Sequence, residues 1–400
     1  MLRRFYVDNF KTLLNVEWVA SAVNLLIGAN NAGKTSLCSA LMFLARTSQG
    51  PIKDAAAFAG EGWQLHNVYL DKPTLDFECE AELMVDDQPY VFDYALSLKV
   101  DSVTPGNAFA TTYVLQSESL WVTPPDGERV ALILNDRGVV TLLHEGRHFR
   151  GMQGEARVET HAPQDTTMLF RLYDLQTNRL ANAFKKYLGS WTYYNLNPLS
   201  MRGPAPAQPA NWVLNVHGDN LASVLFMLKN ISERDHRPIV ELTREIEPKL
   251  DSISFMPAQE QVFMWLSDAD GHNFTPAGIS DGTLRFLGLA YVIISTARAV
   301  SNAGMSSPPI VVIEEPENGI YVGMLRRLFD LIDHSGVSGQ YVFTTHSPYV
   351  IDLFDTMLDG VRVCVRRDTH SELRQLDADK VRGLLGKFSL GELHFREMFV

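Results

Sequence analysis

The sequence is poor in cysteine and has no long apolar run. Its three cysteines, Cys38, Cys79 and Cys364, are widely spaced and form no C-x-x-C pair. We therefore expect neither a disulfide framework nor a zinc site, and we favour a reducing, cytoplasmic setting. The longest apolar stretch, 286–294, falls well short of the roughly 20 residues that cross a bilayer, and the amino terminus lacks the apolar core of a signal peptide. We expect a chain without a membrane segment.

Basic residues are in deficit. Lys and Arg total 35 against 47 Asp and Glu, which gives a formal net charge of −12. This balance provides no general attraction to nucleic acid, so a nucleic-acid contact would need a local basic patch. A sustained heptad pattern is also missing, which counts against a long coiled coil. The apolar and charged shares, 46% and 20%, are typical of a globular chain.

Hydrophobic periodicity divides the chain into four segments. Residues 1–50 indicate strand, strand and helix, and form the first part of an α/β core. Residues 51–164 form a β-rich lobe, because apolar residues alternate with acidic ones over 75–83. Residues 165–250 form a helical insertion. Residues 251–400 alternate strand and helix, and complete the α/β core with a short tail.

Local signals place the helix ends in the insertion. Asp165 is the expected N-cap of a helix whose apolar face carries Met168, Leu172 and Leu175, and Gly189 is its expected end. Pro238 is expected at the first position of a later helix, because proline suits a helix start.

A phosphate-binding loop is the strongest motif. Residues 28–35 fit G-x-x-x-x-G-K-[ST] and lie between a buried strand and an amphipathic helix. Glycines allow backbone amides to wrap phosphates, Lys34 can reach the β and γ oxygens, and the Thr35 hydroxyl can bind Mg²⁺. We expect these nucleotide-binding residues: Gly28, Asn30, Asn31, Ala32, Gly33, Lys34, Thr35 and Ser36.

Three further features follow in a fixed order. The apolar strand 310–313 ends in Glu314 and Glu315, where the first acid can hold Mg²⁺ and the second can activate water. Residues 280–283 open an apolar helix, so Ser280 and Gly282 can cap a phosphate. His346 follows another apolar strand. Each feature alone is commonly structural, but together with the phosphate-binding loop they indicate an ATPase.

These residues together resemble the ABC-type P-loop ATPase heads of the RecF, Rad50 and SMC group, closest to stand-alone AAA_15 and AAA_21, or OLD-like, ATPases of bacterial defence systems. The resemblance implies that residues 28–35 are the Walker A loop. It also implies that Glu314 is the magnesium acid, Glu315 the catalytic base, Ser280 part of the signature motif and His346 the switch histidine.

The same resemblance implies ATP and Mg²⁺ as cofactors and a homodimer of heads, in which Ser280 caps the γ-phosphate held by the other subunit. Asn31 stands where many relatives have glycine, but asparagine tolerates left-handed backbone. Asp281 replaces the first glycine of the transporter signature, which favours the OLD-like group. OLD-like nucleases carry a Toprim domain after the ATPase core, and we expect none here, because only 40 residues follow position 360.

A second motif has to be weighed. Residues 144–148 fit the zinc-protease pattern H-E-x-x-H, but they follow a strand pattern and contain Gly146, so we expect a turn and disfavour a metalloprotease. Three functions then stay open: a switch in an anti-phage defence complex, an ATP-dependent DNA clamp in repair or chromosome maintenance, and a transporter motor, which the signature disfavours.

We expect the chain to act through a separate effector protein, with DNA or a phage-derived molecule as a possible trigger. Contact surfaces are the β lobe, the helical segment and the tail. A group of arginines, Arg362, Arg366 and Arg367, is a candidate basic patch, although such a group is more often a solvated strand edge.

Overall fold

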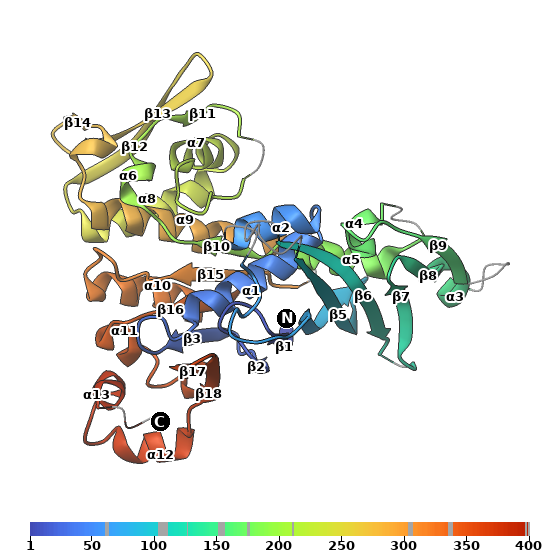
Figure 1. The fold of residues 1–400 in the computed structure, drawn as a ribbon. Coiled ribbons are helices and arrows are strands. Elements are labelled where there is room, and N and C mark those ends of the chain that lie inside the picture. The colour runs from blue at the N-terminus through green and yellow to red at the C-terminus, as the bar shows by residue number, and fades with distance from the viewer. Residues whose placement is uncertain are drawn as a thin grey trace. The chain divides into compact units, whose positions relative to one another are not determined.

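The computed structural model describes residues 1–60, 64–102, 111–125, 127–150, 157–173, 177–209, 212–302, 307–334, 339–396 and 398. The chain forms two compact units. The first comprises Met1–Thr192, Ser306–Ile310 and Leu358–Ala378, and the second comprises Tyr193–Met305, Val311–Met357 and Asp379–Val400. Helices and strands are mixed in both (Figure 1), so the predicted α/β class is confirmed.

The first unit contains a large antiparallel sheet in the order β2-β1-β4-β5-β6-β7-β8-β9 (Figure 1). Side chains of β4 alternate between buried and half-buried almost throughout, as the period of two predicts. The turn between β4 and β5 has positive φ at Asp86 and Asp87, the backbone that a tight two-residue hairpin requires. The strands are β1 (Leu2–Asp8), β2 (Val16–Val19), β4 (Thr74–Val85), β5 (Gln88–Ser102), β6 (Thr111–Thr123), β7 (Val130–Asp136), β8 (Val139–Leu143) and β9 (Arg157–His161).

A second group of strands in this unit places the phosphate-binding loop. The buried strand β3 (Val23–Ile27) pairs in parallel with β17 (Val361–Arg366), and β17 pairs antiparallel with β18 (Ser371–Gln375). Helix α1 (Lys34–Thr47) follows β3 and buries Leu37, Leu41 and Leu44, the face that the sequence predicts. The 3₁₀ turn η2 (Leu358–Gly360) precedes β17.

The expected helix from Asp165 to Gly189 is wrong in its beginning and in its continuity. Thr167 is the N-cap of α4 (Met168–Arg171), and its hydroxyl accepts a 3.1 Å hydrogen bond from the amide of Phe170. The backbone carbonyl of Asp165 instead accepts from the amide of Ile52. A separate helix, α5, then ends at Gly189 as expected. Leu175 lies outside the described residues. The other helices are α2 (Ile52–Ala59), α3 (Glu145–Arg150) and α5 (Arg179–Gly189).

The second unit carries the strands β10 (Thr192–Tyr194), β15 (Ile310–Glu314) and β16 (Gln340–Thr344) as neighbours in that order. Both β15 and β16 are almost wholly buried. The polar residue of β15, Glu314, stands at its carboxyl end, and β16 ends at Thr344, directly before Thr345 and His346. The apolar stretch 286–294 lies inside α9 (Asp281–Asn302), where Phe286, Leu287 and Ala290 are fully buried.

Two helices of the insertion also belong to this unit. In α8 (Glu233–Ile246), Pro238 lies inside the helix, so its expected first position is wrong. The chain starts the helix one turn earlier, where Ser232 is the N-cap and Glu233 and Asp235 supply negative charge to the first turn. Helix α7 (Leu221–Ile231) also lies in the segment 165–250 that the sequence predicts to be helical.

The remaining elements complete the second unit. Strands β12 and β13 form an antiparallel pair, with β11 and β14 beside β13. They are β11 (Ala205–Pro206), β12 (Leu250–Ala258), β13 (Gln261–Asp268) and β14 (Asn273–Phe274); the helical pieces are α6 (Pro198–Met201), η1 (Pro276–Gly278), α10 (Val322–His334), α11 (Pro348–Asp352), α12 (Ala378–Leu384) and α13 (Leu390–Phe395).

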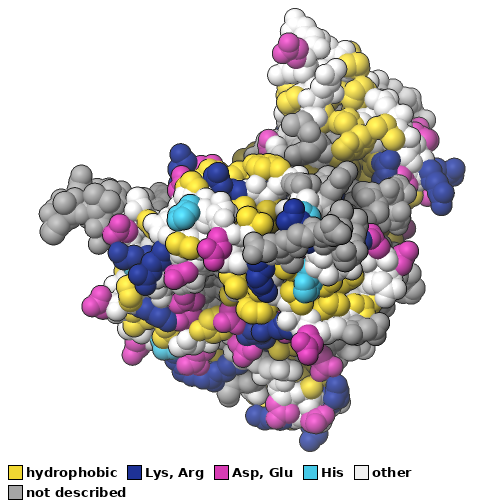
Figure 2. Space-filling view, turned by 90° about the vertical axis from the view of Figure 1, so that its right-hand side faces the viewer, with side chains coloured by type: hydrophobic (Ala, Val, Ile, Leu, Met, Phe, Trp, Pro, Cys, Tyr) yellow, Lys and Arg dark blue, Asp and Glu magenta, His cyan; other side chains and the backbone are white. Residues whose placement is uncertain are grey.

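Among the described residues, none of the helices combines the length and the apolar character that a bilayer crossing needs. On the face in Figure 2, Lys and Arg side chains are interspersed with Asp and Glu side chains. This mixture agrees with a sequence that is acidic overall.

Candidate active site

The loop between β3 and α1 has the backbone that its glycine motif predicts. Gly28 has φ of 145°, and a Cβ atom there would lie 2.3 Å from the carbonyl oxygen of Cys364. Gly33, with φ of 105°, is the N-cap of α1. Asn31 has φ of 62°, which confirms a left-handed asparagine at this position. The loop leads into a helix N-terminus, whose free amides and dipole suit a phosphate.

Lys34 is buried inside this loop. The residue is 6% exposed, and its Nζ donates to the carbonyl oxygens of Gly28 at 2.9 Å and Ala29 at 3.1 Å. Thr35 is exposed at the first turn of α1. The carbonyl oxygens of the loop thus hold the ammonium group of Lys34, and the hydroxyl of Thr35 stays exposed at the start of the helix. The other predicted loop residues are exposed at Asn30 and Asn31, buried at Ala32 and half-buried at Ser36.

Two residues that the sequence analysis missed contact this helix start. The Ser371 hydroxyl donates to Thr12 Oγ1 at 2.9 Å, and Thr12 Oγ1 lies 3.3 Å from the hydroxyl of Ser36. A Cβ atom on Gly33 would come within 2.8 Å of Ser371 Cβ. Thr12 and Ser371 are 359 positions apart and belong to no motif, so only the strand pairing of the folded unit reveals them.

Burial also decides the chemistry of the cysteine beside this loop. Cys364, whose carbonyl oxygen packs against Gly28, has a thiol whose pKa burial raises to about 12. Its thiol is therefore neutral at physiological pH and acts as a packing group.

In the second unit, Glu314 is the last residue of β15 and is half-buried. The hydroxyl of Tyr193 donates to its Oε2 at 2.7 Å. Its other oxygen, Oε1, is buried and has no hydrogen-bond partner among the described residues. A buried carboxylate oxygen without a donor is costly, and a hard divalent cation is the type of group that would satisfy it. Glu314 therefore fits a Mg²⁺ ligand.

Glu315 has a strained backbone at the end of β15. Its φ is 44°, and its amide donates to the carbonyl oxygen of Thr344 at 3.0 Å. Its Oε2 accepts from Asn318 Nδ2 at 2.6 Å, and its Oε1 lies 3.8 Å from Nε2 of His346. Left-handed backbone at a residue other than glycine costs free energy of about 1–3 kcal/mol and often marks a functional site. The structure thus brings together the predicted base and the predicted histidine.

A third acid, Glu317, was missed by the sequence analysis. Its Oε1 accepts from the hydroxyl of Thr345 at 2.5 Å and from the amide of His346 at 3.3 Å. Its Oε2 is buried without a hydrogen-bond partner in the described part of the chain. The signal was available, since Glu317 follows the Glu314-Glu315 pair by only a proline.

Ser280 caps the helix that follows it. Its Oγ accepts from the amide of Thr283 at 3.1 Å and lies 2.7 Å from the Thr283 hydroxyl. A Cβ atom on Gly282 would come within 2.3 Å of the carbonyl oxygen of Gly319, so this helix start packs directly on the turn after the carboxylates. Ser280 itself is exposed, which leaves it accessible to a second molecule.

Two arginines fix this helix start. The guanidinium of Arg202 donates to carbonyl oxygens of η1 at 2.7 and 2.8 Å and to Asp281 Oδ1 at 2.5 Å. Arg285 donates to the carbonyl oxygen of Asn318, and burial lowers the pKa of its guanidinium. The signature segment and the carboxylate turn are therefore one hydrogen-bonded assembly.

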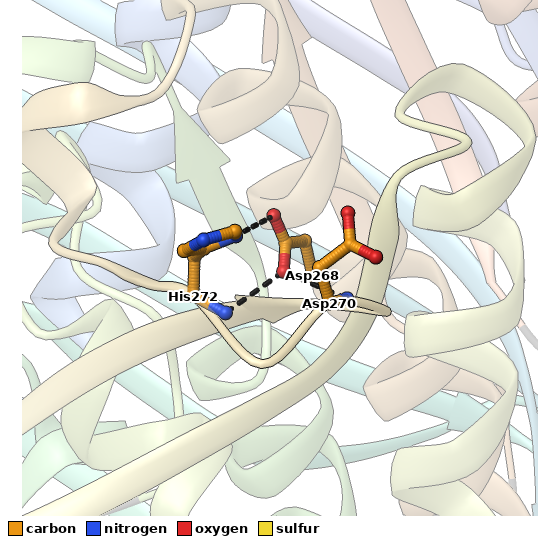
Figure 3. A group of neighbouring side chains, drawn as sticks. All are labelled: Asp268, Asp270 and His272. Carbon is orange, nitrogen blue, oxygen red and sulfur yellow. Dashed lines mark hydrogen bonds and ion pairs between the residues drawn. The ribbon is translucent and has the colours of Figure 1, made fainter.

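The hairpin turn between β13 and β14 carries three residues of metal-ligand type (Figure 3). Asp268 Oδ1 accepts from the amides of Asp270 at 3.0 Å and His272 at 2.8 Å, and Oδ2 lies 3.0 Å from His272 Nδ1. The backbone amide of His272 is the main cause of the lowered pKa of Asp268. These bonds account for the turn, and we assign no ligand to it.

The H-E-x-x-H segment is helical, so the expected turn at Gly146 is wrong. Glu145 begins α3, and its carboxylate oxygens accept from the amides of Leu180 at 2.6 Å and Ala181 at 3.0 Å, in the first turn of α5. A carboxylate at a helix N-terminus satisfies free amides and the helix dipole. Glu145 therefore stabilises the N-terminal end of α5.

Both interpretations of the arginine group near the tail, a solvated strand edge and a basic patch, are wrong for Arg362. Arg362 is 5% exposed, and its guanidinium donates to the carbonyl oxygens of Asp359, Val361 and Val19. Burial lowers its pKa. A guanidinium held by three carbonyls inside the unit is not available to nucleic acid.

Comparison with known proteins gives a family match for part of the chain and similar solved structures for nearly all of it. Residues 215–352 match the AAA_21 family model, described as "AAA domain, putative AbiEii toxin, Type IV TA system". This segment includes the carboxylates, the signature residues and His346, and begins after the phosphate-binding loop. No curated protein matches the chain.

Among solved structures, an SMC head bound to the C-winged helix domain of ScpA aligns with a TM-score of 0.51 and 14% identity, over 96% of this chain and 99% of that chain. The SMC head domain from Thermotoga maritima aligns with a TM-score of 0.43 and 12% identity, over 94% and 99%. An SMC head derived from Pyrococcus furiosus aligns with a TM-score of 0.43 and 14% identity, over 96% of this chain and 98% of that chain. The first alignment shows that the chain has the fold of an SMC head.

Proposed function

We propose that the protein binds and hydrolyses ATP with Mg²⁺. The phosphate-binding loop, with Lys34, Thr35 and the N-terminus of α1, would hold the phosphates. Each unit has one candidate Mg²⁺ ligand: the Thr35 hydroxyl in the first unit and the Glu314 carboxylate in the second. The observation that carries the proposal is the unsatisfied, buried Oε1 of Glu314 at the end of an apolar strand, because a cation explains its position and protein donors do not.

Hydrolysis is assigned to Glu315 and His346. A carboxylate next to a histidine can orient a water and accept its proton, while the imidazole supports the charge that develops on the transferred phosphoryl group. The 3.8 Å separation of Glu315 Oε1 and His346 Nε2 supports joint action. ATP hydrolysis would give ADP and phosphate, with Mg²⁺ neutralising charge on the phosphate oxygens.

We assign Ser280 and Gly282 to a shared site in a homodimer of heads. Ser280 is exposed at the N-terminus of the 22-residue helix α9, which suits the γ-phosphate of ATP bound by a second copy. ATP would then act as the link between the two copies.

At the level of biology, we propose a nucleotide-dependent switch that reports to a separate effector chain in a defence complex. The description of the family model, which names a toxin of a type IV TA system, supports this over the segment it covers. An ATP-dependent DNA clamp is the second candidate, because the fold is that of an SMC head. Filter binding of duplex DNA with and without ATP separates the two, since only the clamp requires ATP-dependent retention of DNA.

The enzymatic proposal is tested by ADP release from the purified chain. Activity should require Mg²⁺ and vanish with EDTA. Lys34→Ala should reduce ATP affinity by about 100-fold, because charged hydrogen bonds to phosphate contribute roughly 3 kcal/mol, while circular dichroism stays unchanged. Parental affinity in Lys34→Ala would remove the loop from the site.

A further inference from the structure

We propose that Glu317 is a positioning residue that holds His346 against Glu315. The inference rests on the proposed roles of Glu315 and His346 in hydrolysis, and it concerns a residue outside the motifs that define the site.

A single carboxylate oxygen of Glu317 holds the segment that carries His346. Oε1 accepts from the Thr345 hydroxyl at 2.5 Å and from the His346 amide at 3.3 Å. Thr345 is fully buried, and its Oγ1 also accepts from the amide of Ser347 at 2.9 Å. The backbone on both sides of His346 is therefore tied, directly or through Thr345, to one acidic side chain.

The carboxylate turn is tied to the same strand end. The Glu315 amide donates to Thr344 at 3.0 Å, and Asn318 donates to Glu315 Oε2 at 2.6 Å. Glu317 lies within this turn, between Glu315 and Asn318. Any shift of the turn relative to the end of β16 would change the 3.8 Å separation of Glu315 Oε1 and His346 Nε2.

Stability alone does not explain a glutamate at this position. Its second oxygen, Oε2, is buried and has no hydrogen-bond partner in the residues described, which opposes folding. A buried polar atom without a partner calls for an explanation, and a role in a site is one such explanation. The charged oxygen Oε1 accepts stronger hydrogen bonds than a neutral oxygen would, and this is a reason for a glutamate at this position.

The test is a double-mutant cycle with Glu317→Ala and His346→Ala. Glu317→Ala should lower kcat by about 10-fold or more, because small misplacements of catalytic groups can cost up to about 100-fold. The affinity for ATP should stay at the parental value. If Glu317 acts through His346, adding Glu317→Ala to His346→Ala should cause no further loss of kcat.

The conservative variant and a control sharpen the result. Glu317→Gln keeps an acceptor oxygen but removes the charge, so it should lower kcat less than Glu317→Ala does, since a neutral hydrogen bond has roughly half the strength of a charge-assisted one. Glu245→Ala removes an exposed carboxylate of the same unit that pairs with Arg327, and should leave kcat unchanged. Thr345→Val removes the hydroxyl donor at nearly constant volume and covers the case in which Glu317→Ala fails to fold.

Losses that multiply in the double variant would overturn the inference, because they mean that Glu317 acts independently of His346. Parental kcat in both Glu317→Ala and Thr345→Val would overturn it too. A parental rate in His346→Ala alone has a different meaning: it removes the proposed role of His346, and the inference with it.

Discussion

Tyr193 donates a 2.7 Å hydrogen bond to one carboxylate oxygen of Glu314, while the other oxygen of Glu314 is buried without a partner in the described residues. The tyrosine thus fixes the carboxylate in an orientation that leaves one oxygen for a cation. Orienting contacts of this kind tune metal ligands in many sites.

Tyr193→Phe should therefore raise the Mg²⁺ concentration required for half-maximal ATP hydrolysis by about fivefold, as expected for loss of a hydrogen bond of roughly 1 kcal/mol. The rate at saturating Mg²⁺ should change little. Tyr291→Phe is the matched control, because that hydroxyl donates to the carbonyl oxygen of Trp212 elsewhere in the same unit. Equal Mg²⁺ requirements for parent and Tyr193→Phe would show that Tyr193 does not orient a metal ligand.

Ser280→Asp should block ATP-linked dimerisation and leave the fold intact. Aspartate caps a helix as well as serine does, so the N-cap of α9 is kept, but its charge repels a γ-phosphate. Sedimentation of the Glu315→Gln protein with ATP should give a dimer, and of the Glu315→Gln/Ser280→Asp protein a monomer with a parental melting temperature. ATP-dependent dimers of the second protein would contradict the shared site.

His236 should make stability depend on pH. The residue is 2% exposed, and neither ring nitrogen has a hydrogen-bond partner in the described residues. Burial lowers its pKa from 6.5. The unfolded chain therefore takes up a proton first as the pH falls below 6.5, and the free energy of unfolding decreases until the pH reaches the lowered folded pKa.

Urea titrations between about pH 7.5 and 5.5 test this. The contribution of His236 is at most about 1.4 kcal/mol per pH unit, and His236→Leu should remove it, so the variant should lose less stability than the parent on acidification. The same slope in both proteins would show that the ring titrates normally in the folded state.

The sequence was informative wherever a signal is local. The strand β3, the loop after it and the strands ending at Glu314 and Thr344 follow from apolar runs and one motif, because a buried strand must deliver its polar groups at its end. The left-handed Asn31 follows in the same way from the loop.

Contacts between residues far apart in the sequence could not be predicted, because they depend on which strands pair. Ser371 meets Thr12 because the start of β18 forms a backbone bridge with Leu13, and Tyr193 meets Glu314 because β10 lies beside β15. Pro238 misled because the helix already begins at Glu233, where the acidic residues of the first turn favour a helix start. The predicted segment boundaries and the roles of the site residues stay predictions.

The central claim is that this head hydrolyses ATP with Glu315 as the base. The most direct measurement compares ATP binding and single-turnover hydrolysis in the parent and in Glu315→Gln, which keeps the volume of the side chain and an acceptor for Asn318. Glu315→Gln should bind ATP with parental affinity and hydrolyse it more slowly by about 100-fold or more, because general-base catalysis contributes about that factor. Hydrolysis by Glu315→Gln at the parental rate would contradict it.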